Sequence, residues 1–252
     1  MELIFPIKPS EYDPRDFIYE YLPRNKTPIP KTLDLRKYLN YPRNQGKRGT
    51  CASFASATIK EYHERLDCNY QGYFSPDSVY FYRSNKPDFG MFLRDAMQIL
   101  QKYGIAYEED FPYTQEREPE SVPQKALEVM PNFKIKEYAQ INSIDGLKEA
   151  LFKNGPCIMA FPVYDNRPEF WRIKSNPVGN GGHAVAVVGY NNKGFIIRNS
   201  WGFSWNGDGT VIYPYKEWGA HWEVWTAVDS ESSFQFPNES IWKKILRLPC
   251  IN

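Results

Sequence analysis

The sequence predicts an α+β protein with two lobes, one mainly helical and one built on an antiparallel sheet. The chain has 252 residues, which is enough for one large domain or two smaller lobes with a proper apolar core. Apolar residues recur at helical spacing in the first half of the chain. In the second half, short β-rich runs alternate with Asn, Gly and Asp, which is typical of strands joined by tight turns. We therefore expect the second lobe to be an antiparallel, barrel-like sheet.

The overall composition argues against several classes of function. Hydrophobic residues make up 42% and charged residues 24% of the chain, as in an ordinary folded protein. The formal net charge of +1 provides no global field that would favour nucleic acid or an anionic membrane. No run approaches the roughly 20 apolar residues that a membrane-spanning helix needs. We expect neither a nucleic-acid partner nor a membrane partner.

The cysteines and the N-terminal residues bear on where the protein works. The spacing of the four cysteines does not suggest a disulfide framework; they are Cys51, Cys68, Cys157 and Cys250. The first residues carry no basic leader, and Pro6 interrupts a short apolar run, so we expect no signal peptide. Together these observations predict an intracellular, reducing compartment, the cytoplasm or its equivalent.

The helices of the first half follow from apolar spacing and capping residues. Small and apolar residues from Ala52 to about Leu66 predict a first helix. Ser75 is suited to cap a second helix, because a proline and an aspartate follow it in the first turn. A third helix is expected over residues 91–103, with Gly104 as its stop.

The second half begins after a polar, Pro-rich stretch. Residues 108–131 are expected to carry the chain between the lobes. Ser143 is suited to cap a short helix that ends before Gly155, and five β-rich runs follow, from CIMAFPV to HWEVWTAV. The expected units are an arm (1–26), a domain (27–229) with a helical lobe (about 44–110) and a β-rich lobe (about 132–229), and a tail (230–252).

One predicted hairpin brings an imidazole next to a carboxamide. The run HAVAVVGYNNKGFIIRNS contains two apolar strands around the turn signal NNKG. A turn centred near Asn191 places His183 opposite Asn199, within one residue. The amide oxygen of Asn199 would then accept a ring N–H of His183 and orient the other ring nitrogen outward. A cross-strand hydrogen bond without function explains this pair equally well until a nucleophile is found nearby.

Cys51 is the candidate nucleophile, because it lies where a Gly-containing loop meets a predicted helix. A thiol at a helix N-terminus faces unpaired N–H groups, which lower its pKa. Gln45 lies six residues earlier, and its amide would donate to an oxyanion together with the Cys51 backbone N–H. The plainer alternatives are a small buried apolar residue for Cys51 and an ordinary loop surface for Gln45.

Four segments in this order resemble those of papain-like cysteine peptidases. NQGKRGTCASFASA resembles the segment around the nucleophile of that family, and GGHAVAVVGY and IIRNSWGFSWNGDGT resemble its His and Asn segments. GMFLRDAMQILQKYGIAYEEDFPY resembles the helix after its substrate-binding glycine. His183 and Asn199 lie 132 and 148 positions after Cys51 by residue number, within the family's range of roughly 130–150. The resemblance covers residues 29–229.

The resemblance implies the two-lobe papain fold, peptide or protein substrates and a role for each matching residue. Cys51 would be the nucleophile, His183 the base and acid, and Asn199 the residue that orients His183. Gln45 would complete the oxyanion hole. The matching substrate-binding positions are Gly90, Trp201, Ala160 and Gly182, with Trp201 also shielding the His–Asn hydrogen bond. No cofactor and no metal are implied.

The sequence also departs from the family pattern. The family usually has Cys three residues before the nucleophile, where this chain has Arg48, and KPDFG replaces the segment that carries the partner cysteine. Both ends of a common family disulfide are therefore missing. Arg48 on the rim of the groove would either add positive charge near the thiolate or be solvated, and we expect it to be solvated. Ala52 stands where the family usually has Trp.

The segment before the resemblance is too short for the long helical propeptide that the family usually carries. Residues 1–26 could instead pack over the groove as a short inhibitory segment, or support the back of a lobe as a strap. Both alternatives stay open here.

The sequence leaves three rivals to a cysteine endopeptidase. They are an exopeptidase or acyl-transferring relative of the bleomycin-hydrolase type, a catalytically silent peptide-binding protein, and a structural protein of a larger particle. Retention of all four catalytic positions argues against the silent protein. A zinc site is not expected, because no metal-ligand spacing joins the remaining candidates, which are His63, Cys68, Cys157 and His221.

Overall fold

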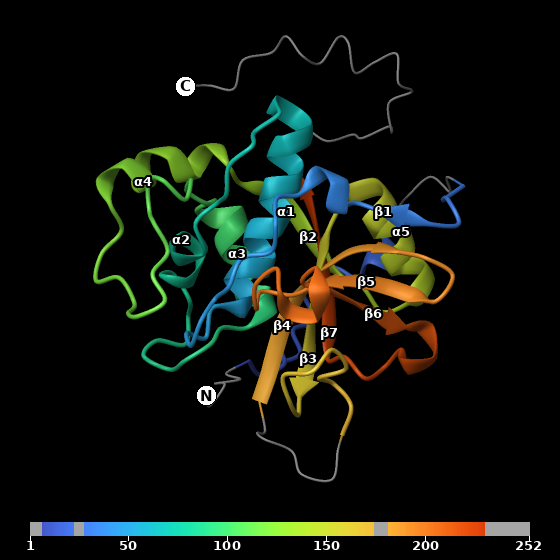
Figure 1. The fold of residues 1–252 in the computed structure, drawn as a ribbon. Helices are drawn as coiled ribbons and strands as arrows, with labels where there is room; N and C mark the ends of the chain where they lie inside the picture. The colour runs from blue at the N-terminus through green and yellow to red at the C-terminus, as the bar shows by residue number, and fades with distance from the viewer. Residues whose placement is uncertain (1–6, 23–27, 174–180, 230–252) are drawn as a thin grey trace.

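A computed structural model describes residues 7–22, 28–173 and 181–229. The helices are α1 (Cys51–Cys68), α2 (Pro76–Tyr80), α3 (Leu93–Lys102), α4 (Gln124–Val129) and α5 (Ile144–Asn154). The strands are β1 (Leu33–Asp34), β2 (Ile135–Gln140), β3 (Cys157–Val163), β4 (Gly181–Tyr190), β5 (Gly194–Arg198), β6 (Thr210–Pro214) and β7 (Glu223–Asp229). Helices α2, α3 and α4 gather on one side of α1, and the sheet with α5 lies on the other (Figure 1). These are the two predicted lobes.

The sheet is antiparallel throughout the described pairings. Its strand order is β2-β7-β3-β4-β5-β6, and β1 pairs with β4. Helix α5 packs against β3, β4 and β7, which gives the β lobe a core of its own. Because β3 pairs with both β4 and β7, the centre of the sheet places Ala160 between Ala184 and Glu223.

The helix predictions hold, with small shifts at the ends. The first helix begins at Cys51, one residue earlier than predicted, and ends at Cys68. Ser75 and Ser143 both accept a backbone N–H from the third residue after them, from Ser78 and Gly146, as N-caps should. Helix α4 was not predicted. It has only six residues and lies in the Pro-rich stretch 108–131, whose composition indicated a loop.

Helix α1 is buried on nearly all sides because it packs against both lobes. It contacts β3 and β4 on one side and α2 and α3 on the other. Its first two turns consist of small residues apart from Phe54, so the strands can approach closely. The shared core joins Ala52 and Ala55 of α1 with Ala184 and Ala186 of β4. The N-terminus of α1 is thereby fixed at the boundary between the lobes.

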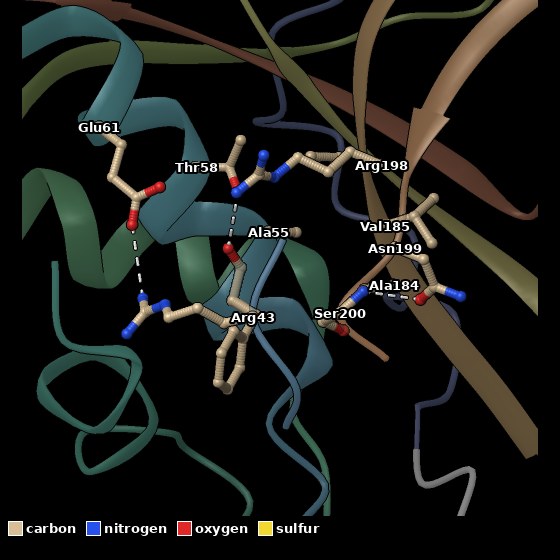
Figure 2. A pocket seen from close by; sticks show the side chains of 11 residues that line it. Arg43, Ala55, Thr58, Glu61, Ala184, Val185, Arg198, Asn199 and Ser200 are labelled. Atoms are coloured by element: carbon tan, nitrogen blue, oxygen red, sulfur yellow. Dashed lines mark hydrogen bonds and ion pairs between the residues drawn. The ribbon is translucent and has the colours of Figure 1, made fainter. Parts of the chain in front are cut away.

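Charged side chains are also buried at this boundary. Glu61 of α1 is 4% exposed, lies 3.4 Å from an Arg43 nitrogen and accepts the Phe74 backbone N–H. Arg198 at the end of β5 donates to the backbone oxygens of Asn40 and Tyr41. Figure 2 shows these side chains around a polar cavity of about 20 Å³ between α1 and the β4–β5 strands.

Cys68 departs from the expectation that the chain has no disulfide framework. It is disulfide-bonded, whereas Cys51 and Cys157 are free and buried. The partner of Cys68 lies outside the described residues, as does the predicted tail 230–252.

Glu61→Leu should destabilise the protein by about 3 kcal/mol, because the buried Arg198 guanidinium would lose the nearby negative charge of Glu61. Arg43 would keep its ion pair with Glu108 at 2.7 Å. The measurement is the free energy of unfolding in urea. Glu137→Leu, at an exposed position of β2, is the control and should change it by less than about 0.5 kcal/mol. Equal effects of the two variants would show that the boundary charges do not hold the lobes together.

Candidate active site

Cys51 occupies the first position of α1 and is completely buried. Its thiol interacts with the backbone N–H groups of Cys51 and Ala52 at the helix N-terminus. It also interacts with the backbone N–H of Ala184 and with the side chain of Gln45. Since Ala184 follows His183 directly on β4, the sulfur lies where the helical lobe meets the β lobe.

His183 and Asn199 form the predicted hydrogen bond. The ring Nε2 of His183 lies 2.7 Å from Oδ1 of Asn199. Asn199 Oδ1 also accepts the Ser200 backbone N–H at 2.8 Å, which identifies it as the carbonyl oxygen. Nε2 of His183 must therefore be the donor, and Nδ1 is the ring nitrogen left free for a second partner.

The predicted hairpin register was wrong by two residues, although the contact is correct. The strands pair Ala186 with Arg198, so continuing the ladder would place Trp201, rather than Asn199, opposite His183. The turn closes at Gly194, which displaces the pairing by three residues from the predicted one, and the bulge between Val187 and Gly189 reduces the difference to two. His183 and Asn199 are diagonal neighbours on one face, within reach of long polar side chains.

Aromatic side chains surround the imidazole. Trp201 stacks on the His183 ring with centroids 4.5 Å apart and 26° between the planes. Phe170 meets the same ring edge-on at 5.6 Å. Both His183 and Asn199 are 2% exposed, so water has little access to their hydrogen bond. Phe170 was missed by the sequence analysis, because it lies in a stretch of irregular structure before residue 174 and carries no motif.

Gln45 is held by the same segment that carries Asn199. Its backbone N–H donates to Ser200 O at 2.8 Å, and its Oε1 accepts from Ser200 Oγ at 2.6 Å. Its Nε2 donates to Arg48 O at 2.8 Å. The contact between Ser200 and Gln45 could not be predicted from sequence, because the two residues lie 155 positions apart and only the fold brings them together.

Burial dominates the pKa values of the two catalytic candidates. It raises the pKa of Cys51 to about 11, more than the neighbouring N–H groups lower it. It lowers the pKa of His183 to about 4, against the opposite effect of the Asn199 hydrogen bond. The N–H groups at the helix N-terminus lower the Cys51 pKa as expected, but burial of the sulfur outweighs them in the described state.

Three of the four positions matched to substrate binding, Trp201, Ala160 and Gly182, lie at or beside His183 and Ala184. Gly90 has φ of +79°, which favours glycine, and its N–H donates to Tyr80 Oη. Ala160 pairs with Ala184, and Gly182 precedes His183 on β4. A Cβ at Gly182 would meet the Trp222 ring at 2.2 Å and Ile7 O at 2.5 Å, so this position has no room for a side chain.

Arg48 contradicts the prediction of a solvated rim charge. It is 7% exposed, and its guanidinium forms a bidentate ion pair with Asp77, with N–O distances of 2.6 and 2.9 Å. Asp77 is the residue after the predicted Pro at the start of α2, and burial raises its pKa against the opposite effect of Arg48. The pairing could not be read from sequence, because a charge in a Gly-rich loop is usually exposed.

In the described part of the chain, no group of three or more His, Cys, Asp or Glu side chains comes together as metal ligands. Within the same residues, every helix is too short or too polar to cross a membrane.

The free energy of unfolding should decrease as the pH falls from 6.5 to 4. His183 binds a proton near pH 6.5 when unfolded but only near pH 4 when folded, so the unfolded state gains protons first. The contribution of one such group is at most about 1.4 kcal/mol per pH unit. Burial also lowers the pKa of His221 to about 4. His183→Gln should therefore remove only part of the dependence of the unfolding free energy on pH, which urea unfolding at several pH values measures. An unchanged slope in this variant would show that His183 is not buried in its neutral form.

Comparison with known proteins places this site in a family. The model of the papain family cysteine proteases matches residues 29–217. An uncharacterized peptidase C1-like protein of Acanthamoeba polyphaga mimivirus is 28% identical over 215 residues, which cover 73% of this chain and 69% of that protein. Cysteine proteinase 3 of Entamoeba histolytica is 26% identical over 197 residues, which cover 73% of this chain and 62% of that protein.

Solved structures show the same fold. Xylellain, a cysteine protease from Xylella fastidiosa, superposes with a TM-score of 0.77 at 26% identity and covers 90% of this chain and 97% of its own. Digestive procathepsin L 3 of Tenebrio molitor has a TM-score of 0.64 at 20% identity, covering 81% of this chain and 71% of its own. Two-lobe architecture, the order of the segments and the family match agree: this chain belongs to the papain family of cysteine proteases.

Proposed function

We propose that the protein hydrolyses peptide bonds through Cys51, His183 and Asn199, with Gln45 in the oxyanion hole. The observation that carries the proposal is the 2.7 Å hydrogen bond from His183 Nε2 to Asn199 Oδ1. It leaves Nδ1 as the proton acceptor beside a thiol that contacts the adjacent Ala184 N–H. Family membership supports a peptide or protein as the substrate.

The reaction begins with proton transfer from the Cys51 thiol to Nδ1 of His183. The sulfur attacks the carbonyl carbon of the scissile bond, and the carbonyl oxygen becomes an oxyanion. The backbone N–H of Cys51 and one N–H of Gln45 Nε2 donate to that oxygen. Collapse of the tetrahedral intermediate breaks the C–N bond, and His183 returns the proton to the leaving amine.

The resulting thioester is hydrolysed by the same groups, with water in place of the Cys51 thiol as the nucleophile. His183 takes a proton from water, the hydroxide attacks the thioester carbon, and a second oxyanion forms in the same hole. Collapse breaks the C–S bond and releases the carboxylic acid, while the sulfur regains its proton from His183. Asn199 holds the ring in the required tautomer throughout, and Trp201 keeps water from their hydrogen bond.

The extended substrate would lie along Gly90, Ala160 and Gly182. Gly182 has no side chain of its own, and its carbonyl oxygen already pairs with the Ile7 N–H of the arm, as it would with a peptide substrate. Gly90 also lacks a side chain, but its N–H is engaged by Tyr80 Oη. An exopeptidase or an acyl-transferring enzyme would use the same centre. Peptides blocked at either terminus separate these alternatives from an endopeptidase.

Cys51→Ala should abolish both cleavage of a fluorogenic peptide library and labelling by a peptidyl epoxide, with the fold intact by circular dichroism. In the unmodified protein, mass spectrometry should place a single adduct on Cys51. Cys157, a buried thiol on β3, provides the matched control, and Cys157→Ala should retain labelling and cleavage. An adduct on any other residue, or cleavage by Cys51→Ala, would contradict the proposed nucleophile.

We further propose that the N-terminal arm inhibits this site by occupying the substrate-binding positions. Ile7 is 2% exposed, pairs with Gly182 in an antiparallel bridge and donates its N–H to Gly182 O at 3.3 Å. Its side chain packs in the same core cluster as Cys51, Met91 and Ala160. A peptide segment thus already pairs with the residue before His183.

Polar contacts fasten the arm beyond Ile7. The backbone N–H and hydroxyl of Ser10 both donate to Glu223 Oε1, at 3.0 and 3.1 Å. Asp16 forms an ion pair with Arg94 at 2.6 Å. These contacts support the inhibitory segment over the alternative of a strap on the back of a lobe, because they lie on β4, β7 and the start of α3.

Ile7→Ala should raise kcat/KM by about tenfold or more. The substitution removes roughly 1.5–3 kcal/mol of apolar burial from the closed state, and 1.4 kcal/mol is a factor of about ten in the equilibrium between closed and open arm. The measurement is peptide hydrolysis under equal enzyme concentration, titrated with the epoxide. Tyr12→Ala is the control, since Tyr12 is 90% exposed on the same arm. Unchanged turnover in Ile7→Ala would assign the arm a purely structural role.

A further inference from the structure

We propose that Arg48 is a positioning residue for the oxyanion hole. Its ion pair with Asp77 holds the backbone carbonyl of Arg48 where it accepts one N–H of Gln45, which leaves the second N–H of that amide for the oxyanion. This inference rests on the proposed function, since it assumes that Gln45 stabilises the oxyanion.

The first step concerns the orientation of the Gln45 amide. A side-chain amide has two N–H donors on one atom and an acceptor on the other. Arg48 O can only accept, so the atom that faces it at 2.8 Å must be Nε2 of Gln45. Oε1 is held on the other side by the Ser200 hydroxyl at 2.6 Å. With one N–H donated to Arg48 and the oxygen engaged, the remaining N–H has a defined direction.

The second step concerns the loop that carries Arg48. Residues 45–50 belong to neither a helix nor a strand, and Gly46 has φ of +65°. At the beginning of the loop, Asn44 forms an isolated bridge with Trp201, and the Gln45 N–H donates to Ser200 O. Tyr113 Oη donates to Gln45 O, and Gln115 Nε2 donates to Asn44 O. These tethers hold the beginning of the loop. The guanidinium of Arg48 holds its far end.

The third step concerns the strength of that anchor. The guanidinium makes two hydrogen bonds to Asp77 and one to Thr114 O at 2.8 Å, and it lies over the Tyr113 ring at 4.9 Å. A bidentate Arg–carboxylate pair fixes direction as well as distance. Because Asp77 is 1% exposed in the first turn of α2, the loop is tied to the rigid helical lobe.

This anchor stands at a position where the chain departs from the family pattern. The family usually has a cysteine there that ties the loop covalently to the segment before the substrate-binding glycine. Here the tie is ionic and leads instead to α2. We infer that positioning of Gln45 has been retained with different chemistry and a different partner.

A double-mutant cycle of Arg48 and Gln45 tests the proposal, since residues that act through one another are not additive. Gln45→Ala should reduce kcat by about 100-fold, as loss of one oxyanion donor does in other enzymes. Arg48→Met should reduce kcat by about tenfold or more, with KM changed by less than about twofold. The double variant should be no slower than Gln45→Ala within about twofold, because Arg48 has no further route to the oxyanion.

A second readout separates positioning from folding. Arg48→Met should weaken binding of a peptide aldehyde, whose hemithioacetal oxygen occupies the oxyanion hole, by the same factor as kcat. Alkylation of Cys51 by iodoacetamide forms no oxyanion and should proceed at the unmodified rate. Lys60→Met is the matched control, since Lys60 is a buried cation of the same lobe, 1% exposed and paired with Glu64 at 2.9 Å. It should leave kcat and aldehyde affinity unchanged.

The outcomes separate this inference from the proposed function. Additive effects of Arg48→Met and Gln45→Ala, or unmodified kcat in Arg48→Met, would overturn the role of Arg48. If Arg48→Met does not fold, Asp77→Asn replaces it in the same cycle and is judged by the same two criteria. Normal kcat in Gln45→Ala would instead overturn the assigned oxyanion hole, whatever Arg48 does.

Discussion

The hydrogen bond between His183 and Asn199 is the interaction on which the site depends. It selects the ring tautomer, and it requires two strands to run side by side with their polar ends on one face. It also requires a dry environment, which Trp201 and Phe170 provide by packing on the ring. The rest of the fold brings the Cys51 sulfur to the backbone N–H of Ala184, the residue that follows His183. Helix α1 achieves this because its small residues let β4 pack closely against its first turns.

Much of this arrangement follows from local sequence patterns. The helix that starts at Cys51, the serine caps at Ser75 and Ser143, and the His–Asn hairpin were each predicted from spacing and residue type. Four ordered segments then pointed to the family and to the candidate catalytic residues. Those features depend on short stretches of chain, where propensity and periodicity act directly.

The features that sequence did not predict depend on long-range burial. The hairpin register differs by two residues because the position of the turn, which closes at Gly194, is not encoded in the apolar pattern. The pKa of Cys51 rises rather than falls because both lobes bury the sulfur. Arg48 forms an ion pair with Asp77, which lies 29 positions later in the sequence. Cys68 is disulfide-bonded. None of these outcomes has a local signature, since each is decided by what packs against the residue in the folded state.

Burial explains how the described state relates to the reaction. With the arm on β4 and β7, burial raises the pKa of the Cys51 thiol and lowers that of the His183 imidazole, which disfavours the charged form of both. In our proposal, departure of Ile7 frees the backbone of Gly182 for substrate and admits solvent to the pair. Proton transfer from sulfur to ring then becomes easier, because a charged pair is better solvated. The arm and the catalytic residues thus form one coupled system.

The ring tautomer of His183 is the most direct test of this account. Nitrogen-15 NMR of histidine-labelled protein distinguishes a protonated from an unprotonated ring nitrogen, and with three histidines in the chain the His183 signals can be assigned by their loss in His183→Gln. The account predicts a neutral ring at pH 7 with the proton on Nε2 and none on Nδ1. A proton on Nδ1 instead would mean that Asn199 does not orient the ring toward Cys51, and the proposed mechanism would be wrong.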